Sequence, residues 1–270
     1  MKLKWLYLLL PAIIFFGSCS QFQKLLKSSD NDLKLSEAKR YYAEKKYSQS
    51  ATLFDDISSY YKGTDHGEEV LYLLAKSYAG QNDFYSASET FKTYVKQYPR
   101  GQYAEESYYM IGYSAYLDSP DARLDQSSTE AAITAFTNFL ESYPKSEFAS
   151  KARQYLAEMK DKLAYKAYLN AKTYYNLGMY LGRNCYLSAV IVAENALKVN
   201  SETKYREDFM ELILESKYAE ARESVEARKA DRYREVIDEY YTYNNEFPTG
   251  KYAKQALTMF KEAQNYIKNR

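Results

Sequence analysis

Apolar residues recur every three or four positions over residues 71–99, with one interruption by polar turn residues. The first apolar face consists of Leu71, Leu74, Ala75 and Tyr78. A turn candidate, Gly80-Gln81-Asn82-Asp83, follows. The second apolar face carries Ala87, Phe91 and Tyr94, and it ends before Pro99. Because this spacing matches the period of a helix and proline stops helices, the stretch predicts two helices joined by a short turn.

The order of large and small residues in this stretch resembles the tetratricopeptide-repeat pattern. Leu71 stands where that pattern has tryptophan, and Ala75 stands where it has glycine. One such helix pair cannot bury its own apolar face, so further copies should stack on it. We therefore expect an all-α fold, a right-handed α-solenoid of about five tetratricopeptide-like helix pairs with a C-terminal capping helix.

Weaker copies of the pattern precede and follow this stretch, and they suggest a solenoid in two halves joined by a linking helix. Residues 32–146 are expected to hold repeats 1–3. Roughly eight extra residues separate the two helices of repeat 3, which predicts a polar loop over residues 117–126. Residues 147–270 are expected to hold a linking helix, bent or broken, then repeats 4 and 5. The capping helix is expected over residues 251–270.

The N-terminal segment has the pattern of a secretory signal. In residues 1–18, two lysines precede an apolar run that ends in small residues. The end of this segment, Phe16-Gly17-Ser18-Cys19, resembles a bacterial lipobox, which implies cleavage before Cys19 and acylation of that residue. Several acyl chains on one residue suffice for stable membrane anchoring. Residues 19–31 would then form a lipidated tether; the alternative is plain secretory cleavage with Cys19 unmodified.

The residues after the cysteine bear on the location of the anchor. Ser20 stands where an aspartate would resemble the inner-membrane retention signal, so the outer membrane is favoured. The next residues, Gln21-Phe22-Gln23-Lys24, lack an acidic patch of the kind that directs export to the surface. We therefore expect the periplasmic face, with an anchor facing the cell exterior as the alternative.

Composition narrows the classes of function. The 37 basic and 36 acidic residues nearly cancel, so no nucleic-acid partner is expected. His66 is the single histidine, and Cys185 is the only cysteine besides Cys19, so neither a metal site nor a hydrolase triad has its residues. A Gly-rich phosphate loop is also missing. We predict no catalytic site, no cofactor and no metal, with His66 in a turn and Cys185 as a packing residue.

The concave side of a two-helix solenoid is its usual binding surface, and the first helix of each repeat lines it. Tyrosine combines apolar area with a hydroxyl, which suits an extended peptide, and lysine suits a terminal carboxylate. The alternative is that the tyrosines simply fill a narrow superhelix. The predicted groove residues are Lys39 and Tyr42 in repeat 1, Tyr72 and Lys76 in repeat 2, and Tyr109, Tyr113 and Tyr116 in repeat 3.

The signal, the lipobox and the degenerate repeats together resemble the BamD family of outer-membrane lipoproteins. The most family-like pieces are the repeat junctions Gln97-Tyr98-Pro99 and Ser142-Tyr143-Pro144. The resemblance implies a lipid-anchored periplasmic scaffold of the β-barrel assembly machinery, which promotes folding and insertion of outer-membrane β-barrel proteins. It also implies two partners. The N-terminal repeats would contact the C-terminal signals of unfolded outer-membrane proteins, and the C-terminal repeats would contact the periplasmic domains of the barrel-forming subunit.

Two other functions are compatible with the sequence. A glycan- or nutrient-binding outer-membrane lipoprotein would use the aromatic wall to stack on sugars. A generic cell-envelope tetratricopeptide scaffold would use the same repeats for other partners.

Overall fold

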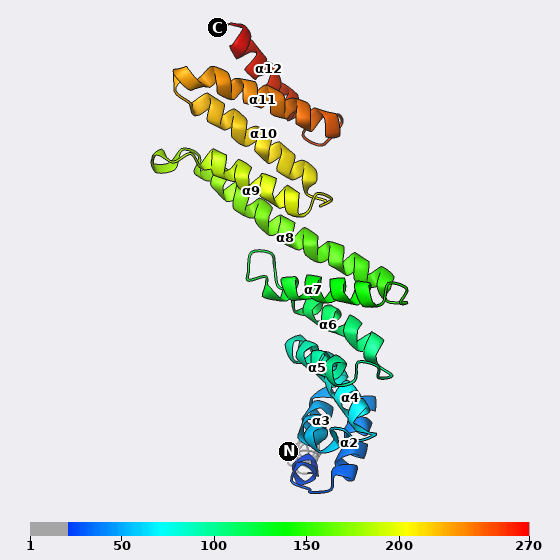
Figure 1. Cartoon of the computed structure of the whole chain (residues 1–270). Coiled ribbons are helices and arrows are strands. Elements are labelled where there is room, and N and C mark those ends of the chain that lie inside the picture. Colours follow the sequence, from blue (N-terminus) through cyan, green and yellow to red (C-terminus); the bar gives the residue numbers. More distant parts are fainter. Residues whose placement is uncertain (1–20, 270) are drawn as a thin grey trace, which may run out of the picture. The chain divides into compact units, whose positions relative to one another are not determined.

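The computed structural model describes residues 21–269, and these residues divide into two compact units (Figure 1). The first unit holds the described chain up to Ser119 together with Ser127–Leu156. The second holds Pro120–Gln126 and the chain from Ala157 onward. All regular structure in the described range is helical, which confirms the predicted all-α fold. The predicted signal and Cys19 lie outside these residues.

The first unit consists of three helix pairs and the start of a long helix. Consecutive helices pack against each other, both within a pair and between pairs, as expected for stacked repeats. The helices are α2 (Asn31–Ala43), α3 (Tyr47–Tyr61), α4 (Gly67–Gly80), α5 (Phe84–Gln97), α6 (Ala104–Asp118) and α7 (Ser127–Ser142), followed by the beginning of α8 (Ala149–Leu177).

The second unit continues the same arrangement of antiparallel helices. The remainder of α8 leads through a short 3-10 turn, η1 (Tyr180–Gly182), into α9. Helix α10 packs against both α9 and α11, and α11 packs against α12. These helices are α9 (Cys185–Val199), α10 (Arg206–Glu223), α11 (Glu226–Glu246) and α12 (Ala253–Lys268).

The small and aromatic residues that define the repeat pattern form the core of the first unit. Ala75 of α4 is fully buried with Ala87 and Phe91 of α5. In the next pair, Gly112 of α6 faces Phe136 of α7, and an added Cβ would lie 2.7 Å from the ring. The glycine therefore lets the two helices approach over an aromatic side chain, which is the role of the small residue in each copy of the motif.

Helix α8 is one uninterrupted helix of 29 residues, so it is not broken, which was one of the two forms expected for the linking helix. It contains neither proline nor glycine, the residues that most often break or kink a helix. It ends at Gly178, whose φ of +56° is the left-handed conformation that glycine adopts most easily.

The insertion in repeat 3 forms an ordered loop whose residues 120–126 belong to the second unit. Lys162 and Lys166 of α8 donate to the carbonyl oxygens of Pro120 at 3.1 Å and Leu124 at 2.8 Å. Ala122, within the loop, is buried. The loop carbonyls are thus satisfied by side chains of α8, which holds the insertion against that helix.

The region predicted to be a tether contains packed residues. Residues 21–26 are helical, and Phe22, Leu25 and Leu26 pack against the core of α2 and α3. The ring of Phe22 contacts Tyr41 edge to face at 5.7 Å. Asp30 then caps α2, since its side chain accepts from the Leu33 amide at 2.9 Å. The chain is therefore folded within a few residues of position 19.

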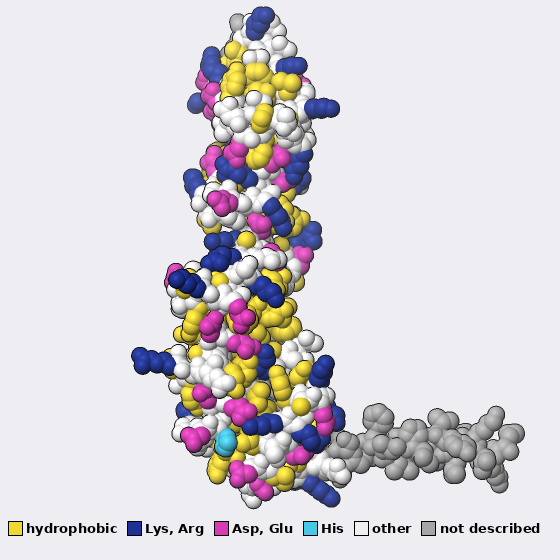
Figure 2. Space-filling model, turned by 90° about the vertical axis from the view of Figure 1, so that its right-hand side faces the viewer, with side chains coloured by type: hydrophobic (Ala, Val, Ile, Leu, Met, Phe, Trp, Pro, Cys, Tyr) yellow, Lys and Arg dark blue, Asp and Glu magenta, His cyan; other side chains and the backbone are white. Residues whose placement is uncertain are grey.

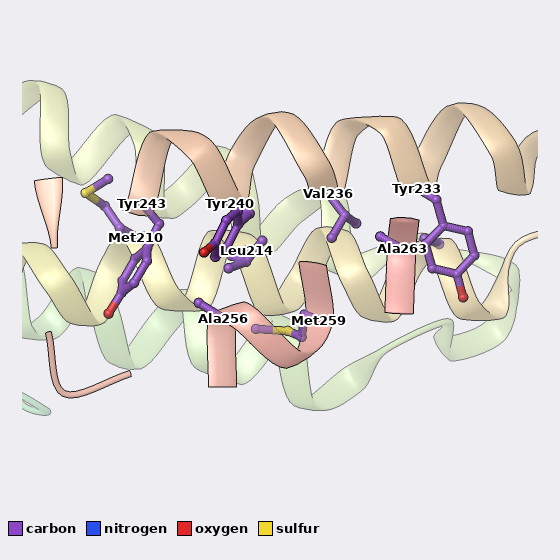
Figure 3. Close-up of a cluster of buried hydrophobic side chains, with 10 residues drawn as sticks. Met210, Leu214, Tyr233, Val236, Tyr240, Tyr243, Ala256, Met259 and Ala263 are labelled. Atoms are coloured by element: carbon purple, nitrogen blue, oxygen red, sulfur yellow. The ribbon is translucent and has the colours of Figure 1, made fainter. Parts of the chain in front are cut away.

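Three helices share the apolar core of the second unit (Figure 3). Met210 and Leu214 of α10 meet Tyr240 and Tyr243 of α11, and Met259 of α12 closes the cluster. Leu214 and Tyr243 are fully buried. Because α12 covers apolar surface of both α10 and α11, it acts as the capping helix that the terminal amphipathic pattern predicted.

The surface carries charges of both signs. Acidic and basic side chains are interspersed on the face seen in Figure 2, with apolar side chains between them. Within residues 21–269, no helix is both long enough and apolar enough to cross a membrane.

Candidate peptide-binding groove

The predicted groove residues lie on α2, α4 and α6, the first helices of the three pairs in the first unit. Lys39 and Lys76 are 37 positions apart, and the same separation relates Tyr72 to Tyr109. The equal spacing places corresponding side chains on the same face of successive first helices.

Both lysines pair with a glutamate on the next first helix. Lys39 Nζ lies 2.6 Å from Glu69 Oε2, and Lys76 Nζ lies 2.9 Å from Glu106 Oε1. All four side chains are between about one quarter and two fifths exposed, so each pair is modest in energy. The lysines thus form ion pairs between neighbouring repeats. A ligand carboxylate would therefore have to share these lysines with the glutamates or displace the glutamates from them.

Tyr72 is largely a packing residue. Its side chain is only 8% exposed, and its ring stacks on Tyr103 at 4.0 Å between centroids. Its hydroxyl donates to Glu106 Oε2 at 2.7 Å. Burial, followed by this hydrogen bond, raises the pKa of Tyr72. Burial alone would raise the pKa of Glu106, but the hydrogen bonds from Lys76 and Tyr72 outweigh it and lower that pKa.

Repeat 3 replaces the charged pair with an aromatic cluster. The cluster consists of Tyr109, Tyr113 and Tyr116 of α6, Phe148 before α8, and Tyr155 of α8. Tyr109 stacks on Phe148 at 4.7 Å, and Tyr155 contacts Tyr116 at 4.4 Å and Tyr113 at 5.5 Å. Tyr109 is buried, and burial raises its pKa to about 12. Tyr113, Tyr116 and Tyr155 are half-buried.

Phe148 and Tyr155 were missed by the sequence analysis. A signal for Phe148 exists, because it occupies the same place after the Tyr143-Pro144 junction as Tyr103 does after Tyr98-Pro99. Both aromatic residues stack on the groove tyrosine of the preceding first helix. Tyr155 lies inside the uninterrupted pattern of α8, which offers no repeat boundary from which to count.

The arrangement offers two kinds of contact. The half-buried faces of Tyr113, Tyr116 and Tyr155 can cover an aromatic or aliphatic side chain. Tyr42, also half-buried, lies close enough to Lys76 and Glu106 for their charges to act on its pKa, which burial raises. The groove residues therefore lie on the first helices of the three repeats, with the charged positions in repeats 1 and 2 and the aromatic cluster in repeat 3.

The single histidine and the cysteine of α9 are not among these groove residues. His66 is the N-cap of α4, and its ring contacts Tyr61 at 5.8 Å. Cys185 is a buried free cysteine at the start of α9. In the described part of the chain, no three His, Cys, Asp or Glu side chains are grouped so that they could hold a metal ion.

Comparison with protein families identifies the chain. The model of the YfiO family, described as outer membrane lipoprotein, matches residues 29–230. The chain belongs to this family. The match spans α2 to the early part of α11, so it includes every groove residue named above. Membership in the YfiO family confirms the BamD-like resemblance and supports association with the outer membrane.

Individual relatives of this YfiO-family chain are distant. A stretch of 160 residues is 20% identical to the outer membrane protein assembly factor BamD of Caulobacter vibrioides. It covers 59% of this chain and 52% of that protein, so the chain spans about half the length of the curated relative that it matches. Among solved structures, the TPR2AB-domain:pHSP90 complex of yeast Sti1 is 14% identical over 87% of this chain and 99% of that one. Its TM-score is 0.39, and no argument rests on this likeness.

Proposed function

We propose that the protein is a lipid-anchored scaffold of the β-barrel assembly machinery on the periplasmic face of the outer membrane. Membership in the outer membrane lipoprotein family and the weak similarity to an outer-membrane protein assembly factor support this role. In this proposal it binds the C-terminal segments of unfolded outer-membrane β-barrel proteins and the periplasmic domains of the barrel-forming subunit. It works by binding and positioning these chains, without catalysis.

The aromatic cluster is the observation that carries the peptide-binding part of the proposal. Tyr113, Tyr116 and Tyr155 are large apolar surfaces that remain partly open at groove positions. The strands of a membrane barrel carry apolar residues facing the lipid and aromatic residues near its interfaces. An extended C-terminal segment of this composition could place an aromatic side chain on the cluster. Its terminal carboxylate would compete with Glu106 for Lys76.

Replacing Tyr113 with alanine is expected to weaken binding of such a segment by roughly 5- to 30-fold, because truncating an interface tyrosine typically costs about 1–2 kcal/mol. Fluorescence anisotropy with a labelled peptide from the C-terminus of an outer-membrane barrel protein measures the change. The variant Tyr85→Ala is the matched control, since Tyr85 lies on the second helix α5 and is 70% exposed. Equal loss in both variants, or in neither, would remove the groove from the proposal.

Lipid anchoring can be tested at Cys19 with an internal control. Cys19→Ser is expected to abolish incorporation of labelled palmitate and to release the protein from membranes, because the anchor supplies the acyl chains. Cys185→Ser should leave labelling unchanged, since Cys185 is buried in α9. Radiolabelling of both variants, followed by membrane fractionation, gives the result. Labelling that persists in Cys19→Ser contradicts the anchor.

The role in barrel assembly requires a cellular test. Depletion of the protein is expected to lower the amounts of many outer-membrane barrel proteins, and affinity purification from solubilised membranes should recover the barrel-forming subunit. If depletion changes the cell wall while barrel proteins remain normal, a general envelope scaffold replaces this proposal. Affinity purification that recovers only unrelated envelope proteins would likewise favour a general envelope scaffold over this proposal.

A further inference from the structure

The residue spacing that defines the groove positions of the first unit can also be counted along the helices of the second unit. In α4 and α6, the groove positions lie six and ten residues after the N-caps His66 and Tyr103, at Tyr72 and Lys76 and at Tyr109 and Tyr113. The N-cap of α10 is Tyr205, and the same offsets reach Glu211 and Glu215. The N-cap of α12 is Tyr252, and the offset of ten reaches Glu262. The second unit thus has glutamates where the first has tyrosines and lysines.

Residues of helix α8 show a similar spacing of aromatic and basic side chains. Tyr168, Lys172 and Tyr175 follow each other at intervals of four and three, as do Tyr109, Tyr113 and Tyr116. Lys172 lies 5.8 Å from the centroid of the Tyr168 ring, and Lys76 lies the same distance from that of Tyr72. Helix α8 therefore carries, within the second unit, a spacing of aromatic and basic residues like that of α4 and α6 in the first.

A hollow of about 340 Å³ opens between α8, α10 and α12 along these positions. Tyr175 of α8, Tyr218 of α10 and Met259 of α12 supply its apolar walls. Its carboxylates are Glu215, which interacts with Tyr175, and Glu262, which accepts from the Tyr218 hydroxyl. Among residues 21–269, no lysine or arginine lies within ion-pair distance of either carboxylate, and Arg222 is the one basic residue in the lining of the hollow.

Two further acidic residues of α10, Asp208 and Glu211, lie outside the lining of the hollow and have partners of their own. Asp208 is paired with Lys251 at 2.8 Å and accepts from the Tyr252 hydroxyl at 2.8 Å. Glu211 is 6% exposed and accepts from Gln255 of α12 at 3.0 Å. Burial, together with the charges of Glu215 and Asp208, raises the pKa of Glu211 to about 7 despite Lys172 of α8 and Lys251.

We propose that this hollow, the C-terminal groove, binds an extended peptide segment that carries a lysine or arginine next to an apolar residue. The basic side chain pairs with Glu215 and Glu262, and the apolar neighbour packs on Tyr175, Tyr218 and Met259. A charged hydrogen bond at a partly buried site is stronger than one at an open surface, so the groove favours a cation. Arg222, which stacks over the ring of Tyr218, excludes a second cation from that end.

The site is separate from the groove of the first unit in both residues and ligand chemistry. Its third wall, α12, lies outside residues 29–230, the part of the chain that the family model matches. At corresponding positions, the first unit carries Lys76 on α4 and the second carries Glu215 on α10. In this proposal the two grooves select segments of opposite charge.

The direct test is fluorescence anisotropy with two labelled heptapeptides and the mature full chain in zwitterionic detergent. Both peptides are acetylated and amidated; one alternates Lys with Leu, and the other alternates Glu with Leu. The Lys peptide is expected to bind at least about tenfold more tightly, with the preference shrinking as salt screens the charges. Equal binding of the two peptides overturns the proposal.

Substitutions locate the site. Glu215→Gln and Glu262→Gln are each expected to weaken the Lys peptide about tenfold, because each removes one charged hydrogen bond. Glu235→Gln is the matched control, since Glu235 is exposed on the second helix α11. An effect of Glu235→Gln equal to that of the groove variants would show general attraction to an acidic surface and overturn the proposal.

Tryptophan fluorescence provides a second measurement, which detects the bound peptide directly and needs no variant that loses binding. Residues 19–270 contain no tryptophan, so Thr258→Trp on the exposed lip of the groove gives a single reporter. Its emission is expected to shift when the unlabelled Lys peptide is added, and to stay unchanged with the Glu peptide. An unchanged spectrum at saturating Lys peptide places that peptide elsewhere and rejects this site.

Discussion

Replacing Phe136 with alanine is expected to lower the free energy of unfolding of the first unit by about 3–5 kcal/mol, the usual cost of deleting a buried aromatic ring. The Phe136 side chain is fully buried. It packs over Gly112 of α6 and against the rings of Tyr109 at 6.1 Å and Tyr155 at 5.8 Å. Its removal leaves a cavity beneath the aromatic cluster. Hydrogen exchange of backbone amides in α6 and α7 measures the loss.

The repeat architecture makes the location of this loss informative. Because each repeat contacts only its neighbours, we expect exchange in α11 and α12 to change little. Phe136→Leu is the control and should cost less, since leucine fills most of the same space. Uniform acceleration of exchange throughout the chain would contradict independent stability of the two units.

Replacing Glu211 with glutamine is expected to stabilise the second unit at about pH 8 by on the order of 1–3 kcal/mol, because burial disfavours the ionised carboxylate. The pKa of Glu211 in the folded protein is about 7, against an ordinary value of 4.5. As the pH rises between these values, the unfolded chain releases the proton first. The free energy of unfolding therefore falls through this window, and the full penalty remains above it.

Denaturation of the wild type and Glu211→Gln at about pH 8 and about pH 4 checks this sign. The gain should be present at the higher pH and largely absent at the lower one, where the native carboxyl is already protonated. Glutamine can still accept the hydrogen bond from Gln255, so the packing is preserved. The surface variant Glu235→Gln should bring no comparable gain at the higher pH. Equal destabilisation of Glu211→Gln at both pH values would mean that the carboxylate is structurally required.

The helix pairs were largely determined by the sequence itself. The spacing of Ala75, Ala87 and Phe91 predicted which residues pack, and all three are fully buried. Such patterns are reliable because a repeat must bury one apolar face against its neighbour, whatever the details of the partner side chains. The same counting located the insertion of repeat 3, which forms the loop held by Lys162 and Lys166.

What the groove side chains do was decided by the tertiary structure. Residue spacing placed Lys39 and Lys76 on the groove face, but only the fold brought Glu69 and Glu106 within 3 Å of them. Spacing likewise predicted that both Tyr72 and Tyr113 line the groove. In the structure, Tyr72 is buried with its ring stacked on Tyr103, whereas Tyr113 is half-buried. Helical periodicity determines on which face a residue lies. Burial, ion pairing and pKa depend on side chains supplied by the next repeat, at distances along the chain that a local pattern does not contain.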